Sequence, residues 1–355
     1  MNSQGRVPRD AAAAMAEAQR IAFAPVVFQA CRVLRESGIL ECVRNAGKPG
    51  MTVEEAARSA QLPRYGAKVL MEAGLGAGLF DIESGRFTLT PLGIVMLRDP
   101  MTRVNMDFVH DVCYRGLFDL DRSVREGRPV GLESHGGWST VYEALSSLPE
   151  QVQRSWFAFD HYYSDRAFPA ALPLVFGDRP RRLTDIGGNT GKWASLCAAH
   201  DSEVAITIVD LPQQLAFARE TLNRRGLAGR VSLHACDLLD PQAALPVDQD
   251  VVWMSQFLDC FSEDQIVSIL RRVRQALAPG GAMYILELFW DRQPNGTAAF
   301  CLQQTSLYFT CIANGNSQMY HSSDLHRCLA AAGMVVEREW DQVGQYHTLQ
   351  KCRVS

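Results

Sequence analysis

The sequence predicts an α/β protein in which a mainly helical N-terminal domain precedes a doubly wound parallel sheet. Three observations support this fold class. Residues 21–145 follow the order helix, helix, helix, hairpin; apolar runs alternate with helices from Arg182 onward; and a glycine-rich turn follows the first of these runs. A chain of 355 residues is long enough for two domains. We therefore expect a polar lead-in over residues 1–20, a helical domain over 21–145 and a sheet domain over 146–355.

Composition and charge disfavour several classes of protein. Hydrophobic residues make up 47% of the chain, which argues against general disorder. The 35 basic residues do not outnumber the 39 acidic ones, so we expect no nucleic-acid partner. The ten cysteines and eight histidines form no metal-type motif, so we expect no metal and a cytoplasmic protein with reduced thiols. The first 20 residues lack the apolar segment of a signal peptide, and we expect no membrane span.

The helical region has the element order of a winged helix. Apolar residues at helical spacing predict a helix over Ala22–Arg44. A second helix, Thr52–Ala60, opens with the capping-box pattern Thr-Val-Glu-Glu, and a third is expected over Tyr65–Ala77. Alternating runs around Ser84-Gly85 predict a hairpin. Residues 1–105 hold 13 basic and 10 acidic residues, too weak an excess for DNA binding, so we expect a dimerisation or substrate-lid role.

The second region alternates strands with helices. Strands are expected at LTDIG, AITIVDL, VSLHACDL, DVVWMSQFL and MYILELFW, and helices at Trp193–Ala199, Gln213–Arg225 and Glu263–Ala278. Continuous apolar strands that alternate with helices are typical of a parallel sheet covered on both faces. The sequence therefore predicts a doubly wound sheet in this region.

A glycine-rich turn follows the first strand of this sheet. The segment Leu183–Gly191 reads LTDIGGNTG, with Asp185 at the end of the strand and glycines at 187, 188 and 191 before a helix. Glycine lets the backbone turn tightly and approach a ligand, and the helix N-terminus offers free N–H groups. The spacing GGxxG differs from the GxGxxG of dinucleotide sites, which favours a ligand without pyrophosphate; S-adenosylmethionine fits.

Acidic residues end the next two strands. Asp210 follows Ile208-Val209 at the end of the second strand, where a carboxylate can accept hydrogen bonds from both hydroxyls of a ribose. Asp237 follows the third strand, where the amino group of an adenine would lie. A glycine loop alone is weak evidence, but the loop together with both acids predicts a nucleoside-type site.

These motifs resemble a known family. DIGGNTG, VDLP, CDLLD and LAPGGAMYILE are similar to the motifs of class I methyltransferases. The domain order and the Ala-Gly-Met sequence at Gly333 resemble, more narrowly, small-molecule O-methyltransferases with an N-terminal winged-helix dimerisation region. The resemblance extends from about Phe23 to Val354. It implies a seven-stranded Rossmann-like domain, a homodimer, S-adenosyl-L-methionine as methyl donor and S-adenosyl-L-homocysteine as product.

The expected cofactor site combines the glycine loop with the ends of the first four strands. Polar groups at the carboxyl ends of such strands belong near a ligand. The expected cofactor-binding residues are Asp185, Gly187, Gly188, Gly191, Asp210, Leu211, Asp237, Leu238, Ser255 and Gln256.

The catalytic segment departs from the family pattern. Relatives usually read LHDWSDE after the fourth strand, with the His as general base, whereas Phe257–Asp264 reads FLDCFSED. An ungapped alignment places Asp259 at the His position; an alignment with an insertion would place Leu258 there instead. Of two acids that support the His in many relatives, one corresponds to Glu287 and the other position holds Met319.

An aspartate is a poor base for a phenol unless its surroundings change it. The pKa of a free Asp is about 3.9, against about 10 for a phenol. Asp259 lies among apolar residues, where burial would raise its pKa, although an Asp before a helix is also an ordinary cap. His161 is an alternative base, because a His titrates near neutral pH, and a structural role competes with this one. The expected catalytic residues are thus Asp259, Glu287 and His161.

Two further segments are expected to line the substrate cavity. They are the aromatic run before the glycine loop and the charge-free helix Phe300–Ala313, and each is also compatible with plain core packing. For Asn314, a role as the helix C-cap competes with a ligand contact. The expected substrate-binding residues are Phe157, Tyr163, Phe309, Thr310 and Asn314.

The resemblance implies methyl transfer to a small, hydroxylated, aromatic substrate. O-methylation follows from the family, and C-methylation of a phenol ring is the alternative because the usual His is replaced. A second hypothesis is an inactive winged-helix protein that senses a ligand, although the cofactor motifs remain intact. A nicotinamide dehydrogenase is a third, disfavoured by the glycine spacing.

Overall fold

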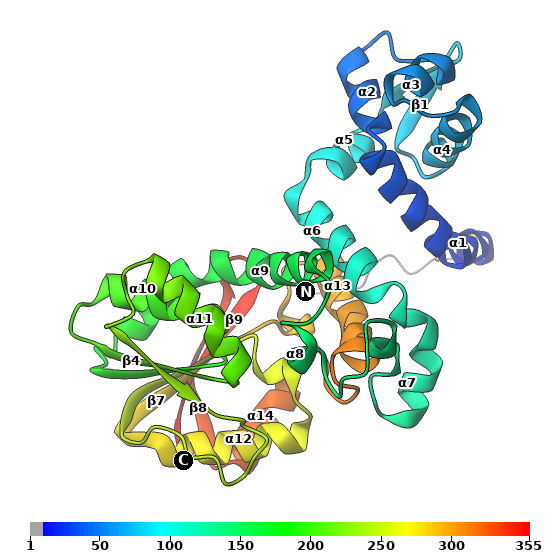
Figure 1. The fold of residues 1–355 in the computed structure, drawn as a ribbon. Helices are drawn as coiled ribbons and strands as arrows, with labels where there is room; N and C mark the ends of the chain where they lie inside the picture. The colour runs from blue at the N-terminus through cyan, green and yellow to red at the C-terminus, as the bar shows by residue number, and fades with distance from the viewer. Residues whose placement is uncertain (1–9) are drawn as a thin grey trace. The chain divides into compact units, whose positions relative to one another are not determined.

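The computed structural model describes residues 10–355, which form two compact units, residues 10–110 and 111–355 (Figure 1). The sequence places the division later, at 145/146. Residues 111–145 belong to the second unit because they pack on its core. A Cβ on Gly116 would lie 2.5 Å from the carbonyl oxygen of Gly131, and the Cys311 thiol donates to the Gly116 carbonyl at 3.1 Å. Helical periodicity predicts a helix but not the core that it joins.

The first unit is a winged helix followed by two further helices. The predicted order of three helices and a hairpin is present, with one additional helix that results from a break in the first. The elements are α1 (Ala11–Glu36), α2 (Ile39–Ala46), α3 (Val53–Ser59), α4 (Arg64–Gly76), β1 (Phe80–Glu83), β2 (Arg86–Leu89), α5 (Pro91–Arg98) and α6 (Pro100–Phe108).

Helix α1 begins earlier than expected and ends earlier. The Asp10 side chain accepts a hydrogen bond from the Ala13 N–H at 2.8 Å and caps the helix, so residues 11–20 are helical rather than a lead-in; residues 1–9 lie outside the described residues. The predicted helix Ala22–Arg44 is broken because Gly38 adopts a left-handed conformation with φ of 81°. By length and composition alone, α1 is long and apolar enough to cross a membrane.

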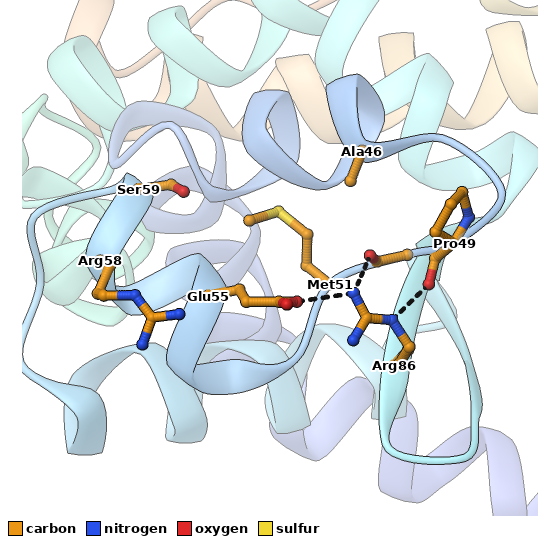
Figure 2. Close-up of a pocket in the computed structure, with 8 residues that line it drawn as sticks. Ala46, Pro49, Met51, Glu55, Arg58, Ser59 and Arg86 are labelled. Atoms are coloured by element: carbon orange, nitrogen blue, oxygen red, sulfur yellow. Dashed lines mark hydrogen bonds and ion pairs between the residues drawn. The ribbon is translucent and has the colours of Figure 1, made fainter.

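The hairpin is tied to the preceding helices by one arginine. The Arg86 guanidinium donates to the carbonyl oxygens of Pro49 and Gly50 at 2.6 and 3.0 Å and to the Glu55 carboxylate at 2.8 Å (Figure 2). Glu55 also completes the predicted capping box with Thr52. Arg86 and its three partners also line the pocket whose residues Figure 2 draws.

The second unit contains a seven-stranded sheet with helices on both faces. Helical segments precede the sheet and connect its strands. In chain order, the helices and strands of this unit are η2 (Gly116–Asp119), α7 (Leu120–Glu126), η3 (Val130–Ser134), α8 (Val141–Ala144), α9 (Glu150–Phe176), β3 (Arg182–Ile186), α10 (Lys192–His200), β4 (Ala205–Asp210), α11 (Pro212–Arg224), β5 (Val231–Ala235), β6 (Gln249–Ser255), η4 (Leu258–Cys260), α12 (Glu263–Ala276), β7 (Leu277–Glu287), η5 (Trp290–Arg292), α13 (Gly296–Tyr308), η6 (Phe309–Ala313), α14 (Ser322–Ala331), β8 (Met334–Val343) and β9 (His347–Val354).

The strand order is β5-β4-β3-β6-β7-β9-β8, with β3 to β7 parallel and β9 antiparallel to both neighbours. This confirms the predicted α/β class and the seven-stranded sheet. Helices α10 and α11 cover one face and α12 and α14 the other (Figure 1). On the first face, Trp193 stacks on Trp253 with ring centroids 3.9 Å apart. This contact packs α10, the helix that follows the glycine loop, against strand β6 of the sheet.

Candidate active site

The predicted site residues meet at the carboxyl ends of the parallel strands. The chain moves from β3 outward to β4 and β5, then returns to the other side of β3 at β6. Such a reversal of strand order opens a crevice at the carboxyl edge. The glycine loop and the segments after β4, β6 and β7 all leave this edge, so the fold brings them together there.

Both the backbone turn and the neighbouring side chains require glycine at positions of this loop. Gly187 and Gly191 have φ values of 70° and 74°, in the left-handed region that favours glycine. A Cβ on Gly187 would lie 2.3 Å from the Phe257 ring, and one on Gly188 would lie 2.7 Å from Ile208. The sequence explained these glycines by close approach to a ligand; close packing of the loop against the sheet and the catalytic segment is a second reason.

Asp210 is anchored so that both of its oxygens keep a free lone pair. One carboxylate oxygen accepts the Asn189 N–H at 2.9 Å and the other accepts the Leu211 N–H at 2.8 Å. Burial raises the pKa of Asp210 to about 6. The geometry suits a pair of vicinal hydroxyls. Asp237 lies exposed after β5, beside the buried Leu238, as a second acceptor at the same edge.

Asp185 lies deeper than Asp210. Its side chain is buried at the end of β3, and one carboxyl oxygen, Oδ2, has no hydrogen-bond partner within the described chain. Burial, and then the nearby charge of Asp210, raise the pKa of Asp185 to about 8. This carboxyl group is therefore largely protonated at neutral pH until a cation or a donor approaches.

Asn189 and Asp160 extend the site beyond the sequence prediction. Asn189 stands at a left-handed position with φ of 48°, which Asn tolerates better than most residues. Its amide nitrogen donates to the Asp160 carboxylate of α9 at 3.3 Å, so one loop residue connects α9 with Asp210. Burial, and then Asp259, raise the pKa of Asp160 to about 7. No motif marks Asp160, because its role depends on a contact between separate elements.

Glu287 binds the backbone of the segment Phe257–Asp264 with one of its two carboxyl oxygens. Its Oε1 atom accepts the backbone N–H groups of Phe257 and Leu258 at 2.9 and 2.8 Å. Its Oε2 atom is buried and has no partner within the described chain. Burial and the adjacent Asp259 raise the pKa of Glu287 well above its usual range. Glu287 is thus in place to fix the short turn η4, which contains Asp259.

Asp259 is a buried acid within this turn. Its side chain is only 6% exposed, and burial raises its pKa to about 7. The Cys260 thiol donates to its Oδ1 atom at 3.4 Å, and the Tyr142 hydroxyl lies beside Cys260. The upward shift expected from the apolar sequence around Asp259 is therefore present, and Tyr142 is a neighbour that the sequence did not indicate.

His161 contacts the glycine loop. Its Nε2 atom lies 3.3 Å from the Thr190 hydroxyl, and its ring stacks on Phe157. Burial, and then Lys192, lower the pKa of His161 to about 4, so the ring is neutral at physiological pH. A base role for His161 stays a prediction, and its observed contacts also suit a structural role in the loop.

The expected substrate residues occupy two elements. On α9, Phe157 packs edge-on against Phe217, and Tyr163 packs edge-on against Tyr346. On η6, Phe309 is buried. These aromatic side chains pack on other aromatic side chains, as either a cavity wall or a core would require, so substrate contact by them stays a prediction.

The polar members of that set already bind the protein. The Thr310 hydroxyl donates to the Ser306 carbonyl at 3.1 Å. The Asn314 amide donates to the Cys260 carbonyl at 2.5 Å, while its oxygen accepts from the Ser317 hydroxyl at 2.9 Å. Asn314 therefore connects the end of η6 to the turn that contains Asp259. This role differs from both roles expected from the sequence, a helix C-cap and a ligand contact.

Several buried polar atoms at this edge have no partner within the described residues and are available to a ligand. Buried polar groups are normally hydrogen-bonded, so exceptions need an explanation. The buried atoms without a partner in the described chain include Asp185 Oδ2, Asn189 Oδ1, Ser255 Oγ and Glu287 Oε2. This mixture of acceptors and a hydroxyl fits the hydroxyls, ammonium and sulfonium of S-adenosylmethionine. Among residues 10–355, no group of three or more His, Cys, Asp or Glu side chains is arranged to hold a metal ion.

Two family models match the chain, one for each region. Residues 16–87 match the Dimerisation2-like domain, and residues 175–334 match the O-methyltransferase domain. The first match lies within the winged-helix unit. The second covers β3 to α14 and so includes the glycine loop, the strand-end acids and Asp259.

Individual relatives agree with these matches. The 3-hydroxy-5-methyl-1-naphthoate 3-O-methyltransferase of Streptomyces sahachiroi is 34% identical over 258 residues, 71% of this chain and 72% of that protein. The L-tyrosine C(3)-methyltransferase of Streptomyces lavendulae is 22% identical over 317 residues, 88% and 85% of the two chains. The O-methyltransferase NcsB1, solved with S-adenosylmethionine and 2-hydroxy-5-methyl naphthoic acid, has the same fold, with a TM-score of 0.70 at 19% identity over 92% and 96% of the two chains.

Proposed function

Because this chain belongs to the family of S-adenosylmethionine-dependent small-molecule O-methyltransferases, we propose that it methylates the hydroxyl group of a small phenolic substrate. The main support is the arrangement at the carboxyl edge of the sheet, where the anchored Asp210 follows β4 and the buried Asp259 follows β6. S-adenosyl-L-methionine supplies a methyl group already activated on a sulfonium. The protein therefore has to align the acceptor and remove its proton.

Asp259 takes the place of the usual histidine base. Burial raises the pKa of Asp259 to about 7, which brings it within about three units of a phenol and makes proton removal more favourable than for an exposed Asp. Glu287 holds the backbone on the N-terminal side of Asp259, and Asn314 holds the carbonyl of Cys260 on the other side. These two residues position the base in a fixed turn, and neither has to exchange a proton.

This assignment predicts the pH dependence of the reaction. A base works only when deprotonated, and burial raises the pKa of Asp259 to about 7. We therefore expect kcat/KM to fall about tenfold per unit as the pH drops below 7 and to level off above 8. Asp160 has a pKa raised to about 7 as well and lies near Asp259, so the Asp160→Asn variant separates the two acids: the acid limb should remain, displaced to slightly lower pH because one neighbouring negative charge is removed. A flat profile from pH 5 to 8 would contradict the assignment of Asp259.

The proposed reaction is tested by methyl transfer itself. Protein supplied with carbon-13 methyl-labelled S-adenosylmethionine is offered a panel of hydroxybenzoates, hydroxynaphthoates and tyrosine, and the products are analysed by NMR. A labelled methoxy group on a phenol is the expected result. An inactive sensor of the methyl donor would bind it and label none of these acceptors.

C-methylation of a phenol ring is the second candidate. It is favoured by the Asp at the position where the family usually has His. A match to an L-tyrosine C(3)-methyltransferase, 22% identical and covering 88% of this chain, also favours it. Loss of the phenol proton raises the electron density at the ortho carbon, which forms the bond to the methyl group as the bond to sulfur breaks; the ring proton then leaves. In the same experiment, an aryl methyl signal in place of a methoxy signal would establish this outcome.

We also propose that the chain forms a homodimer through its first unit. Helix α1 exposes large apolar side chains, among them Ile21, Phe23 and Val26, which are 61 to 67% exposed in the single chain. Residues 16–87 match a Dimerisation2-like domain, which favours a second copy as the partner that covers this face.

Light scattering tests the dimer. Wild-type protein at micromolar concentration is expected to have twice the chain mass of 39.3 kDa, and the double variant Phe23→Asp, Val26→Asp is expected to be monomeric. Val124→Asp is a matched control, because Val124 is an exposed apolar residue on α7. A monomeric wild type would contradict the proposal.

We propose that the protein is cytoplasmic. All ten cysteines are free thiols, and seven of them are buried. Reduced thiols are typical of cytosolic proteins. Fractionation of the producing cells checks this assignment.

A further inference from the structure

A histidine from the last strand reaches the candidate site. His347 is the first residue of β9, and β9 runs antiparallel to β7, with Thr348 paired to Glu287. The start of β9 therefore lies at the carboxyl edge of the parallel strands, although His347 is far from the site in the sequence. Its side chain is fully buried, and its Nε2 atom lies 3.0 Å from Oε1 of Gln256.

The contact with Gln256 Oε1 assigns the tautomer of His347. Burial lowers the pKa of His347 to about 3, so the ring is neutral and carries one proton. Because Oε1 can only accept, this proton is on Nε2 and is donated to Gln256. Gln256 consequently turns its Nε2 amide group away from His347.

Gln256 has a backbone conformation that is uncommon for its residue type. Its φ is 46°, in the left-handed region, and its N–H donates to the Leu286 carbonyl at 2.9 Å. Non-glycine residues in this region are concentrated at functional sites, where the surrounding structure supports the strain. The Gln256 side chain is half-buried, and the hydroxyl of the adjacent Ser255 is buried without a partner within residues 10–355.

We propose that His347 is a positioning residue, which holds the Gln256 amide so that its N–H groups donate to an oxygen of the bound methyl donor. The inference rests on the proposed use of S-adenosylmethionine. A residue without a donor at position 347 leaves the Gln256 amide free to rotate, and an amide that presents its oxygen to another oxygen repels it. His347 acts only through Gln256, so its removal matters only while Gln256 is present.

Titration calorimetry with S-adenosylhomocysteine tests this coupling on the full-length protein. Gln256→Leu is expected to raise the Kd about tenfold, since it removes one hydrogen-bonding group. His347→Phe is expected to raise it about three- to tenfold, and the double variant is expected to bind no more weakly than Gln256→Leu alone. His326→Phe is the matched control, because His326 on α14 binds Glu339 and Gln350 and none of the candidate site residues.

A further variant separates orientation from folding. Gln256→Glu keeps an acceptor for the His347 N–H but has no amide donor, so it is expected to bind S-adenosylhomocysteine as weakly as Gln256→Leu while the thermal unfolding of the ligand-free protein stays unchanged. The inference is overturned if Gln256→Glu binds like wild type, if His347→Phe binds like wild type, or if the effects of His347→Phe and Gln256→Leu add. A wild type that does not bind S-adenosylhomocysteine overturns the proposed function itself, and this inference with it.

Discussion

Replacing Asp259 by Asn is expected to lower kcat by about 100- to 1,000-fold and to leave the Kd for S-adenosylhomocysteine within about twofold of wild type. An amide cannot take the proton of the acceptor. The turn that contains residue 259 should keep its shape, because Glu287 and Asn314 hold it through backbone groups on either side of Asp259. Steady-state kinetics with labelled methyl donor measures kcat, and calorimetry measures the Kd.

Two further variants sharpen this prediction. Asp264→Asn is a matched control, because Asp264 is an exposed acid in the first turn of α12 and should leave kcat unchanged. Asp259→His restores the residue type that the family usually has at this position and should recover part of the lost rate. If Asp259→Asn keeps more than about a third of wild-type kcat, the rate does not depend on a base at this position.

Asp210→Asn is expected to weaken S-adenosylhomocysteine binding by about 100-fold or more. The two oxygens of Asp210 accept the backbone N–H groups of Asn189 and Leu211 and keep lone pairs for the ribose hydroxyls. In the Asn variant, an NH₂ group must face one of these N–H donors or the ligand, so at least one charged hydrogen bond is lost, worth about 1.5–3 kcal/mol, and one donor is left unpaired. The Kd is measured by calorimetry at pH 7.5.

The control for this variant lies at the other edge of the sheet. Asp248 is an exposed acid directly before β6, where its carboxylate pairs with Arg182, so Asp248→Asn should bind S-adenosylhomocysteine like wild type. If Asp210→Asn also binds within about threefold of wild type, the ribose is not held by this carboxylate and the cofactor site has to be sought elsewhere.

Most of the fold is local enough to be predicted from the sequence. The strands β3 to β7 are short apolar runs with helices between them, and this alternation permits few arrangements other than a parallel sheet. The Thr52 capping box and the Ser84-Gly85 hairpin likewise depend only on residues within one turn. The glycine loop and Asp210 could be identified for the same reason, since each lies at the end of a predictable strand.

Features that depend on contacts between distant segments could not be predicted. The sequence did not reveal that Glu287 binds the backbone N–H groups before Asp259, that Asp160 binds the glycine loop through Asn189, or that His347 reaches Gln256. Each of these contacts joins residues at least 29 positions apart. The division between the units also depends on distant contacts, because the helices of residues 111–145 pack on η6.

The central claim is that the carboxyl edge of the seven-stranded sheet holds S-adenosylmethionine. Calorimetric titration of ligand-stripped wild-type protein with S-adenosylhomocysteine tests it most directly. We expect one molecule to bind per chain with a Kd in the micromolar range or below, about −8 kcal/mol or more favourable. The absence of any binding heat at several temperatures, with no shift of the unfolding temperature at millimolar ligand, would contradict the account.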